Sequence, residues 1–437
     1  MSEARPRSDY AGGVLASAPP RQLLLDVSNI ARSDARTGIQ RVVRALVSAF
    51  QRVEVPGLTV RLVAADRLTR YRYLPDDWLE TAGGDRHLLL DQFESVDVRR
   101  NDIFLGLDFT ASILPRHESQ LAAWRELGVE ITILVYDLLP LTHGRWFSWR
   151  MRRNFRRWLR VIENQADSVI AISASAAREF EAWNRQRRLR PRRRVAVAAA
   201  RLGGDISATL PSRGLPENGK QILAWMERRP TVLMVGTIEP RKGYGHALAA
   251  FERLWRKREG PQLLVIGRGG WKTKRLQERM RRVCGGNSHF MWLDSVSDEF
   301  LEYIYAKAAG LLVASEGEGF GLPIVESLSH GRPVLVRDLP VFRELAGPGV
   351  TFFSARTARD LAEAVELWLR DNRNGPAIPP RAVSSWDQTA AEILGLILPS
   401  TPRQPSLDAR EAAGATSTVA RSAGSDHLRG LKERSFG

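Results

Sequence analysis

The 437-residue sequence contains a single cysteine, Cys284, and can therefore form no internal disulfide. A lone cysteine is typical of proteins from a reducing compartment. The longest apolar run, ITILVYDLLPL, is interrupted by Asp137 and Pro140 and is shorter than the roughly 18–20 apolar residues of a membrane-spanning helix. The first residues, MSEARPRSDYAGG, lack the apolar core of a secretory signal. From these absences we expect a cytoplasmic protein without a membrane span.

Motifs of several enzyme classes are also missing. The sequence has no Asp-x-Asp pair, no G-x4-G-K-[ST] phosphate loop, and only seven scattered histidines. The missing phosphate loop argues against an ATPase, and the scattered histidines argue against a zinc site. Without an Asp-x-Asp pair, no evident carboxylates could hold a metal ion against a diphosphate. We therefore expect no metal and no other cofactor.

Positive charge, in contrast, is abundant. The chain carries 65 Lys+Arg against 49 Asp+Glu, a formal net charge of +16. Such a charge attracts nucleic acid, anionic lipid or phosphorylated small molecules. Because the sequence shows no nucleic-acid-binding module and no aromatic residues interleaved as in a single-strand binder, we expect no nucleic-acid partner.

Apolar strand patterns alternate with helical patterns in two series. The first series is LLLDV, LTVRLVAA, DIFLGL, EITILVY, SVIAIS and RVAVAA, and the second is PTVLMVG, QLLVIG, HFMWL, GLLVAS, RPVLV and GVTFF. Repeated strand–helix units predict parallel sheets covered by helices. Because a polar segment over residues 203–220 separates the two series, we predict an α/β protein with two Rossmann-like, doubly wound domains that face each other.

These patterns also predict the domain boundaries. We expect a flexible leader over 1–20, a first domain over 21–212, a second over 213–380, a final amphipathic helix over 381–398 and a disordered tail over 399–437. In open α/β sheets, ligands bind beyond the carboxyl ends of the strands. The residues that directly follow each strand are therefore the candidates for a site.

One candidate is the segment SEGEGFGLPIVESLSHGRPVLV, Ser315–Val336, which reads as a strand end, a loop and a helix. Loop glycines such as Gly319 and Gly321 let backbone N–H groups approach a ligand, and a helix N-terminus favours an anion. Glu318 and Glu326 can project toward one pocket, where a carboxylate could accept hydrogen bonds from a sugar's vicinal diol. The alternative, two glutamates on a solvated face, is disfavoured by the intervening GFGLP.

A second candidate is VGTIEPRKGYGHAL, Val235–Leu248, which also follows a strand. It places Arg241 and Lys242 in a turn before a helix that begins near Gly245. Two adjacent cations at the end of a strand can neutralise a diphosphate. The alternative is an ordinary basic turn in a basic protein, but the position after a strand favours a functional role.

These two segments, in this order and at this spacing, resemble glycosyltransferase family 4, a retaining family with the GT-B fold. The resemblance extends from about Leu23 to Leu398. It implies that the second domain binds a nucleotide sugar, that the first binds the acceptor, and that the final helix crosses back to the first domain. TGIQRV and YDLLPLTH resemble bacterial mannosyl- or rhamnosyltransferases of O-antigen assembly, which favours a GDP-sugar and leaves UDP-sugars open.

The resemblance also implies the roles of individual residues. Glu326 would hold the ribose hydroxyls and Glu318 the transferred sugar, while Arg241 and Lys242 would hold the diphosphate. The backbone of the loop between them would contact the phosphates or the sugar; its residues are Gly319, Phe320, Gly321 and Leu322.

The first domain matches the family less closely. Gly38 stands where the family has a glycine near the donor phosphates, although a glycine that begins a helix is often structural. The family's His-Asp at a strand end is Tyr136-Asp137 here, and His143 from the next loop could supply the imidazole or be incidental. Asp298 occupies the turn where the family seats the base, and it is equally plausible as a helix N-cap.

Two arginine-rich segments, Arg145–Arg160 and Arg185–Arg194, remain. In a helix over the first segment, Trp146 and Trp149 share the arginine face, opposite an apolar face made by Phe147, Met151, Phe155, Trp158 and Leu159. Tryptophans among arginines are typical of a membrane-surface helix, which suggests an anionic inner-leaflet surface as a partner. The alternative is a solvated face.

The sequence thus predicts a peripheral, retaining glycosyltransferase. It would move a hexose, mannose or rhamnose, from a nucleotide-sugar donor to a glycan or lipid-linked acceptor in lipopolysaccharide or related cell-surface polysaccharide synthesis. The alternative is a degenerate GT-B protein that binds a nucleotide sugar or glycan without transfer. The presence of Arg241, Lys242, Glu318 and Glu326 argues against that alternative.

Overall fold

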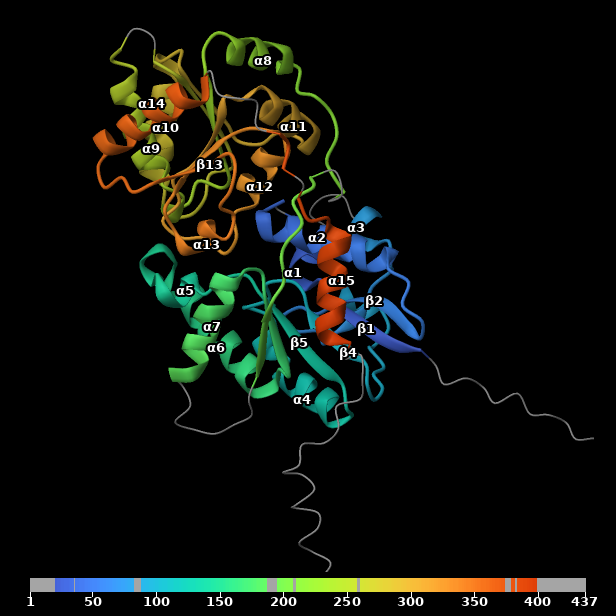
Figure 1. Ribbon diagram of the computed structural model, residues 1–437. Coiled ribbons are helices and arrows are strands. Elements are labelled where there is room, and N and C mark those ends of the chain that lie inside the picture. The colour runs from blue at the N-terminus through green and yellow to red at the C-terminus, as the bar shows by residue number, and fades with distance from the viewer. Residues whose placement is uncertain are drawn as a thin grey trace, which may run out of the picture. The chain divides into compact units, whose positions relative to one another are not determined.

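The computed structural model describes residues 20–34, 36–81, 88–186, 195–206, 210–257, 260–373, 379–381 and 383–398. They form two sheets flanked by helices (Figure 1). The predicted leader, except for residue 20, and the predicted tail lie outside these residues.

The first sheet has seven strands in the order β3-β2-β1-β4-β5-β6-β7. Their bounds are β1 (Arg21–Asp26), β2 (Leu58–Ala64), β3 (Arg72–Tyr73), β4 (Ile103–Gly106), β5 (Glu130–Val135), β6 (Ser168–Ala171) and β7 (Ala196–Ala199). All neighbours are parallel except β2 and β3, which are antiparallel. The sequence did not indicate β3, because a two-residue strand shows no apolar periodicity. The order of the strands reverses between β1 and β4, the switch point of this sheet.

The second sheet has six parallel strands in the order β10-β9-β8-β11-β12-β13. Their bounds are β8 (Thr231–Val235), β9 (Gln262–Ile266), β10 (Phe290–Leu293), β11 (Gly310–Val313), β12 (Val334–Arg337) and β13 (Val350–Phe353). Its switch point lies between β8 and β11. These two doubly wound sheets, parallel except for the β2–β3 pair, confirm the predicted fold class.

Helices cover both faces of the second sheet, and the strand side chains alternate between them. Val232 and Met234 pack against α9 (Tyr244–Leu254), α10 (Lys274–Gly286) and α14 (Ala358–Arg373). Leu233 packs on the opposite face, whose helices are α8 (Gly219–Glu227), α11 (Asp298–Lys307), α12 (Leu322–Ser329) and α13 (Pro340–Arg343). Burial on both faces explains why these strands are continuous apolar runs in the sequence.

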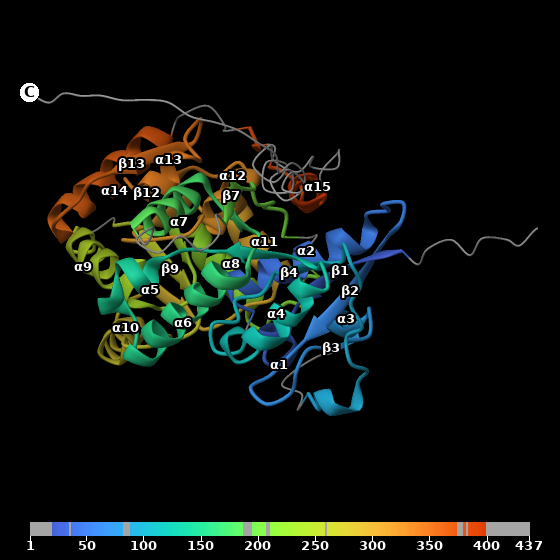
Figure 2. The same ribbon diagram turned by 90° about the horizontal axis from the view of Figure 1, so that it is seen from below.

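The core on one face of the first sheet contains α4 (Glu118–Glu126), α6 (Trp149–Gln165) and α7 (Ala174–Gln186). Figure 2 shows α4 and α6 side by side. The other helices and turns of this half are α1 (Ser28–Arg32), α2 (Gly38–Arg52), α3 (Trp78–Thr81), α5 (Leu139–Thr142), η1 (Leu90–Gln92), η2 (Leu114–Arg116) and η3 (Gly144–Trp146).

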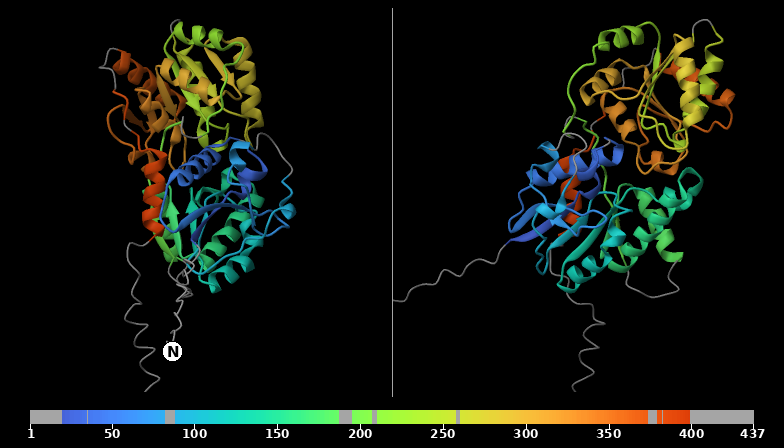
Figure 3. Two further views of the ribbon diagram at one scale, coloured as in Figure 1. Left: turned by 90° about the vertical axis from the view of Figure 1, so that its right-hand side faces the viewer. Right: turned by 180° about the vertical axis from the view of Figure 1, so that it is seen from behind.

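The last helix, α15 (Trp386–Ile397), packs against α2, as the red and blue helices in Figure 3 show. The Thr389 hydroxyl donates to the Arg201 carbonyl at 2.8 Å, and the Trp386 indole N–H donates to the Asp205 carbonyl at 2.9 Å. These bonds tie α15 to the chain that leaves the first sheet. The predicted crossover of the final helix is therefore confirmed.

The predicted Arg145–Arg160 helix is wrong at its start. The chain forms the short turn η3, and α6 begins only at Trp149, after Ser148 caps its first turn with a side-chain hydrogen bond of 3.2 Å. This break removes Trp146 from the arginine face: it is 5% exposed, whereas Trp149 is 68% exposed. The expectation that both tryptophans face solvent therefore holds only for Trp149.

The apolar face predicted for the same helix is only partly correct. Phe155, Trp158 and Leu159 are buried as expected. Met151, however, is 37% exposed, and Phe147 precedes the helix. The apolar contacts of α6 thus begin in its second turn.

Candidate active site

The two motifs meet at the switch point of the second sheet. Arg241 and Lys242 lie in the turn η4 (Pro240–Lys242), which follows β8, and Glu318 lies in the loop between β11 and α12. Because β8 and β11 are neighbours in the sheet, loops that are more than 70 residues apart in sequence become adjacent. This is the position where open α/β sheets bind ligands.

Glycines bring the loops into close contact. Gly243 has φ +72, and a Cβ there would lie 2.3 Å from the Ala314 carbonyl oxygen at the end of β11. A Cβ at Gly319 would lie 2.1 Å from the Tyr136 carbonyl oxygen, beyond β5 of the first sheet. Any larger residue at these two positions would force the loops apart.

Glu318 is held by two cations. Its Oε1 lies 2.6 Å from the Lys242 Nζ and accepts a hydrogen bond of 2.7 Å from the Ser315 hydroxyl, while its Oε2 pairs with Arg241. Arg241 Nε also pairs with Glu239 Oε2 at 2.9 Å. Burial alone would raise the pKa of Glu318, but the two cations outweigh it and lower that pKa to about 2. The carboxylate is therefore charged at neutral pH.

Glu326, in α12, is 1% exposed and has protein donors at both carboxylate oxygens. Arg41 Nη1 lies 2.5 Å from its Oε1, and the Tyr305 hydroxyl donates to its Oε2 at 2.8 Å. Arg41, which comes from the first turn of α2, was not singled out in the sequence. Its nearness to Gly38 was a signal, but its partner is 285 residues away.

Asp298 is the second acceptor of Arg41, with Oδ1 2.6 Å from Nη2. Its other oxygen accepts hydrogen bonds from the backbone and hydroxyl of Ser212, at 2.9 and 2.8 Å. The interpretation of Asp298 as an N-cap is wrong, because Ser297 caps α11 by accepting from the Phe300 N–H at 3.0 Å. Burial would raise the pKa of Asp298, but Arg41 and the bonds from Ser212 lower it.

The three candidate residues of the first domain, Asp137, Gly38 and His143, have different surroundings. Asp137, beyond β5, accepts a hydrogen bond of 2.9 Å from the Leu139 N–H, and burial raises its pKa although Arg241 opposes the shift. Gly38 begins α2, and a Cβ there would meet no atom within 4 Å. The His143 ring stacks on Trp146 at 4.5 Å.

These groups surround a cleft with a volume of about 720 Å³, within the usual range for ligand sites. The predicted residues that line it are Gly38, Asp137, Arg241, Lys242, Glu318, Gly319, Phe320, Gly321, Leu322 and Glu326. His143 is not among its lining residues. Across the described ranges, no three His, Cys, Asp or Glu side chains gather as a metal site would require.

The comparisons with known proteins agree with this geometry. The family model "Glycosyl transferases group 1" matches residues 217–381, the part of the chain that carries the second sheet and both motifs. Residues 217–381 are a group 1 glycosyltransferase domain.

The proteins that are similar to this chain include mannosyltransferases. The serotype-specific mannosyltransferase WbdA of Escherichia coli is 38% identical over 355 residues, which are 80% of this chain and 43% of WbdA. The O-antigen chain mannosyltransferase B of Escherichia coli is 33% identical over 158 residues, 36% of this chain and 40% of that protein. The chain thus spans less than half the length of WbdA.

Solved structures share the fold at low sequence identity. HepE from Anabaena, in complex with UDP and glucose, matches 86% of this chain and 95% of its own with a TM-score of 0.55 and 16% identity. Sucrose-phosphate synthase from Thermosynechococcus elongatus matches 91% of this chain and 100% of its own with a TM-score of 0.59 and 16% identity. The fold is GT-B.

Proposed function

We propose that this protein is a retaining glycosyltransferase that moves a hexose from a nucleoside-diphosphate sugar to a glycan or lipid-linked acceptor in cell-surface polysaccharide synthesis. The observation that carries the proposal is the cluster of Arg241, Lys242 and Glu318 at a switch point, inside a group 1 glycosyltransferase domain. The similarity to WbdA, which is named a mannosyltransferase, supports mannose as the hexose. GDP-mannose is therefore the donor to test.

The charges of the cluster suit the reaction. When the bond from the sugar C1 to the diphosphate breaks, negative charge grows on the phosphate and positive charge on the sugar ring. Arg241 and Lys242 can stabilise the first charge and Glu318 the second. The acceptor hydroxyl forms the new bond to C1 on the face that the diphosphate leaves, and its proton passes to a diphosphate oxygen. Fixed charges of this kind typically contribute about 3–4 kcal/mol per contact to the transition state.

Glu326 can take the ribose role only by exchanging a hydrogen bond, because both of its oxygens have protein donors. Arg41 is the donor that can leave, since Asp298 remains its partner at 2.6 Å. Two neutral ribose hydroxyls would then donate to Glu326 in place of the charged Arg41. In this proposal, donor binding and the Arg41–Glu326 ion pair compete.

Two experiments test the function. A thermal-shift screen with GDP, UDP, dTDP and ADP should show the largest rise in melting temperature with GDP, because a ligand of the folded state stabilises it. NMR of the protein incubated with GDP-mannose should then show mannose released or transferred as the α-anomer first. Binding of GDP without any turnover would contradict the enzymatic proposal and favour a non-catalytic binding protein.

We also propose that the arginine face of α6 lies on an anionic membrane surface. No helix in the described part of the chain is long and apolar enough to cross a membrane. Trp149 is exposed beside Arg150 and Arg153, a combination that suits a lipid interface. Most of the second basic segment, Arg187–Arg194, lies outside the described residues. Its first residue, Arg185, forms an ion pair with Glu181, with Nη1 3.7 Å from Oε2. Flotation with phosphatidylglycerol but not phosphatidylcholine liposomes is expected, and equal behaviour with both would contradict it.

A further inference from the structure

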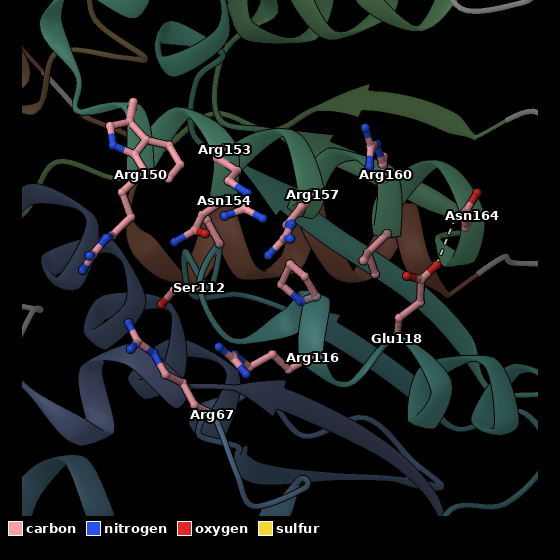
Figure 4. A pocket seen from close by; sticks show the side chains of 14 residues that line it. Arg67, Ser112, Arg116, Glu118, Arg150, Arg153, Asn154, Arg157, Arg160 and Asn164 are labelled. Carbon is pink, nitrogen blue, oxygen red and sulfur yellow. Dashed lines mark hydrogen bonds between the residues drawn. The ribbon is translucent and has the colours of Figure 1, made fainter.

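A second hollow, separate from the donor cleft, lies in the first half of the chain between α6, η2 and the loop after β2 (Figure 4). Its volume is about 680 Å³. Six arginines line it, and we name it the arginine pocket after them: Arg67, Arg116, Arg150, Arg153, Arg157 and Arg160. Figure 4 shows Arg157 and Asn154 reaching from α6 toward Arg116 and Arg67.

Among the described residues, the arginines of this pocket have one acidic neighbour in its lining, Glu118, and form no ion pair. Over the residues that the structure describes, no ion pair or side-chain hydrogen bond holds any of the six guanidinium groups; Arg153 only lies over the Trp149 ring, at 5.8 Å. The acidic lining residue, Glu118, accepts a hydrogen bond of 2.9 Å from Asn164, at the end of the pocket near Arg160. Within the described part of the chain, the lining of the pocket therefore has six arginines against one glutamate, an excess of positive charge that an anion can neutralise.

Protein stability does not explain this arrangement. Arg150, Arg153, Arg157 and Arg160 recur at the helical period on one face of α6, and like charges at this spacing destabilise a helix. Arg67 and Arg116 come from other elements and add two more cations to the same hollow. Repulsion among so many unpaired charges is relieved when an anion binds, which points to a binding site.

The pocket adjoins the donor cleft without being part of it. Met151 and Trp158 of α6 line the cleft, whereas Arg150 and Arg157 of the same helix line the pocket. A ligand in the arginine pocket would therefore lie against a different face of α6 from the face that lines the cleft. Its lining residues all belong to the first half of the chain, whereas Arg241, Lys242 and Glu318 belong to the second half.

We propose that the arginine pocket binds the diphosphate group of a lipid-linked acceptor, an inference that rests on the proposed transferase function. A diphosphate that joins a lipid to a sugar keeps about one negative charge on each phosphate, and its two phosphates offer more acceptor oxygens to the arginines than one phosphate does. Arginine forks bind such oxygens bidentately. Leu68, next to Arg67, is 92% exposed and Trp149, next to Arg150, is 68% exposed. These two apolar side chains suit a diphosphate that is joined to a hydrocarbon chain.

Calorimetry with inorganic pyrophosphate tests the site without requiring activity. Wild-type protein is expected to bind pyrophosphate at two sites, of which Arg241→Ala removes the one in the donor cleft. Arg157→Ala should weaken the other at least about tenfold, because it deletes charge-assisted hydrogen bonds. The matched control is Arg156→Ala, which removes an exposed arginine of the same helix that does not line the pocket; its affinity should equal that of the wild type. Inorganic phosphate should bind the pocket more weakly than pyrophosphate.

Three results would overturn the proposal. The first is a single pyrophosphate site, lost in Arg241→Ala. The second is an equal effect of Arg156→Ala and Arg157→Ala, which would mean unspecific attraction to a basic surface. The third is an Arg157-dependent binding of phosphatidylglycerol vesicles with no binding of pyrophosphate, which would assign the pocket to bulk anionic lipid. If pyrophosphate binds as expected but GDP-mannose is not turned over, the transferase proposal fails while the anion site itself stands.

Discussion

Each of the two sheets has a switch point with ionisable groups, and the two switch points differ in what surrounds them. In the first sheet, Asp26 ends β1 and Asp108 follows β4. In the second sheet, the cation pair Arg241 and Lys242 follows β8, and Glu318 follows β11. Only the second group lines the cleft that we propose for the donor.

The carboxyls of the first sheet are enclosed by the protein's own neutral donors. Asp26 accepts hydrogen bonds from the Tyr71 hydroxyl at 2.9 Å and the Ser28 N–H at 3.0 Å, and Asp108 accepts from the Ile30 N–H at 2.6 Å. Burial raises the pKa of Asp26 to about 6 and that of Asp108 to about 7. With no cation to offset burial, these groups fix loops rather than hold a charged ligand.

Glu318 is nearly as enclosed, with its side chain 10% exposed, yet its pKa is about 2, because Arg241 and Lys242 outweigh the effect of burial. The comparison teaches that topology supplies a place for a ligand, while the charges beside it decide whether the place is functional. The predictions that follow test this difference.

The largest expected effect is on turnover in Arg241→Ala. Removing a preorganised cation from the departing diphosphate should lower kcat about 10²- to 10³-fold. The matched control is Arg359→Ala, which removes an arginine whose side chain is 72% exposed in α14 and should leave kcat unchanged. Steady-state kinetics with GDP-mannose measure both. Equal activity of Arg241→Ala and wild type would remove the main functional distinction between the two switch points.

A smaller effect, on stability, is expected from the first switch point. Because the folded state keeps Asp26 and Asp108 protonated at a pH where the unfolded chain has lost these protons, stability should fall as pH rises from about 4 to 7. For each carboxyl, the free energy of unfolding should fall by about 1.4 kcal/mol per pH unit between its pKa in the unfolded chain and its pKa in the folded protein. For Asp26 this pH range ends near the folded pKa of about 6. Urea unfolding of Asp26→Asn at several pH values should show a flatter dependence than the wild type; an identical slope would show that Asp26 does not titrate as described.

Substitutions of Glu318 and Glu326 should have different effects. Glu326→Ala should weaken nucleoside diphosphate binding at least about tenfold, since it removes a charged acceptor of the ribose hydroxyls. Glu318→Ala should leave that affinity nearly intact and lower turnover, because its contact to the sugar matters most in the transition state. Calorimetry with GDP and kinetics with GDP-mannose separate these effects. Equal losses of GDP affinity in both folded variants would contradict the assigned roles.

The smallest expected effect is that of metal removal. Arg241 and Lys242 already supply positive charge beside the site proposed for the diphosphate, so transfer should proceed unchanged in EDTA. Assays with EDTA and with added Mg²⁺ or Mn²⁺ measure this directly. Activity that disappears in EDTA and returns with either metal would show that the two cations do not suffice.

Much of this organisation could be predicted from the sequence, because both sheets are covered by helices and their strands are apolar runs. The loops that carry Arg241, Lys242 and Glu318 could be predicted because they directly follow such runs. The Arg41–Glu326 ion pair could not, since it joins residues 285 apart that belong to different strand series. Trp146 was misplaced because helical periodicity was extended backward through Ser148, the residue that caps α6. Periodicity indicates which face is apolar, but a single capping residue decides where the face begins.

The central claim is that the second switch point, and not the first, binds the donor. Calorimetric titration of GDP into wild type, Arg241→Ala and Asp26→Asn at pH 7 tests it most directly, because the two substitutions remove one charged group from each switch point. The account predicts that Arg241→Ala loses at least about tenfold in affinity while Asp26→Asn binds GDP like the wild type. Unchanged affinity in Arg241→Ala, or a comparable loss in folded Asp26→Asn, would contradict it.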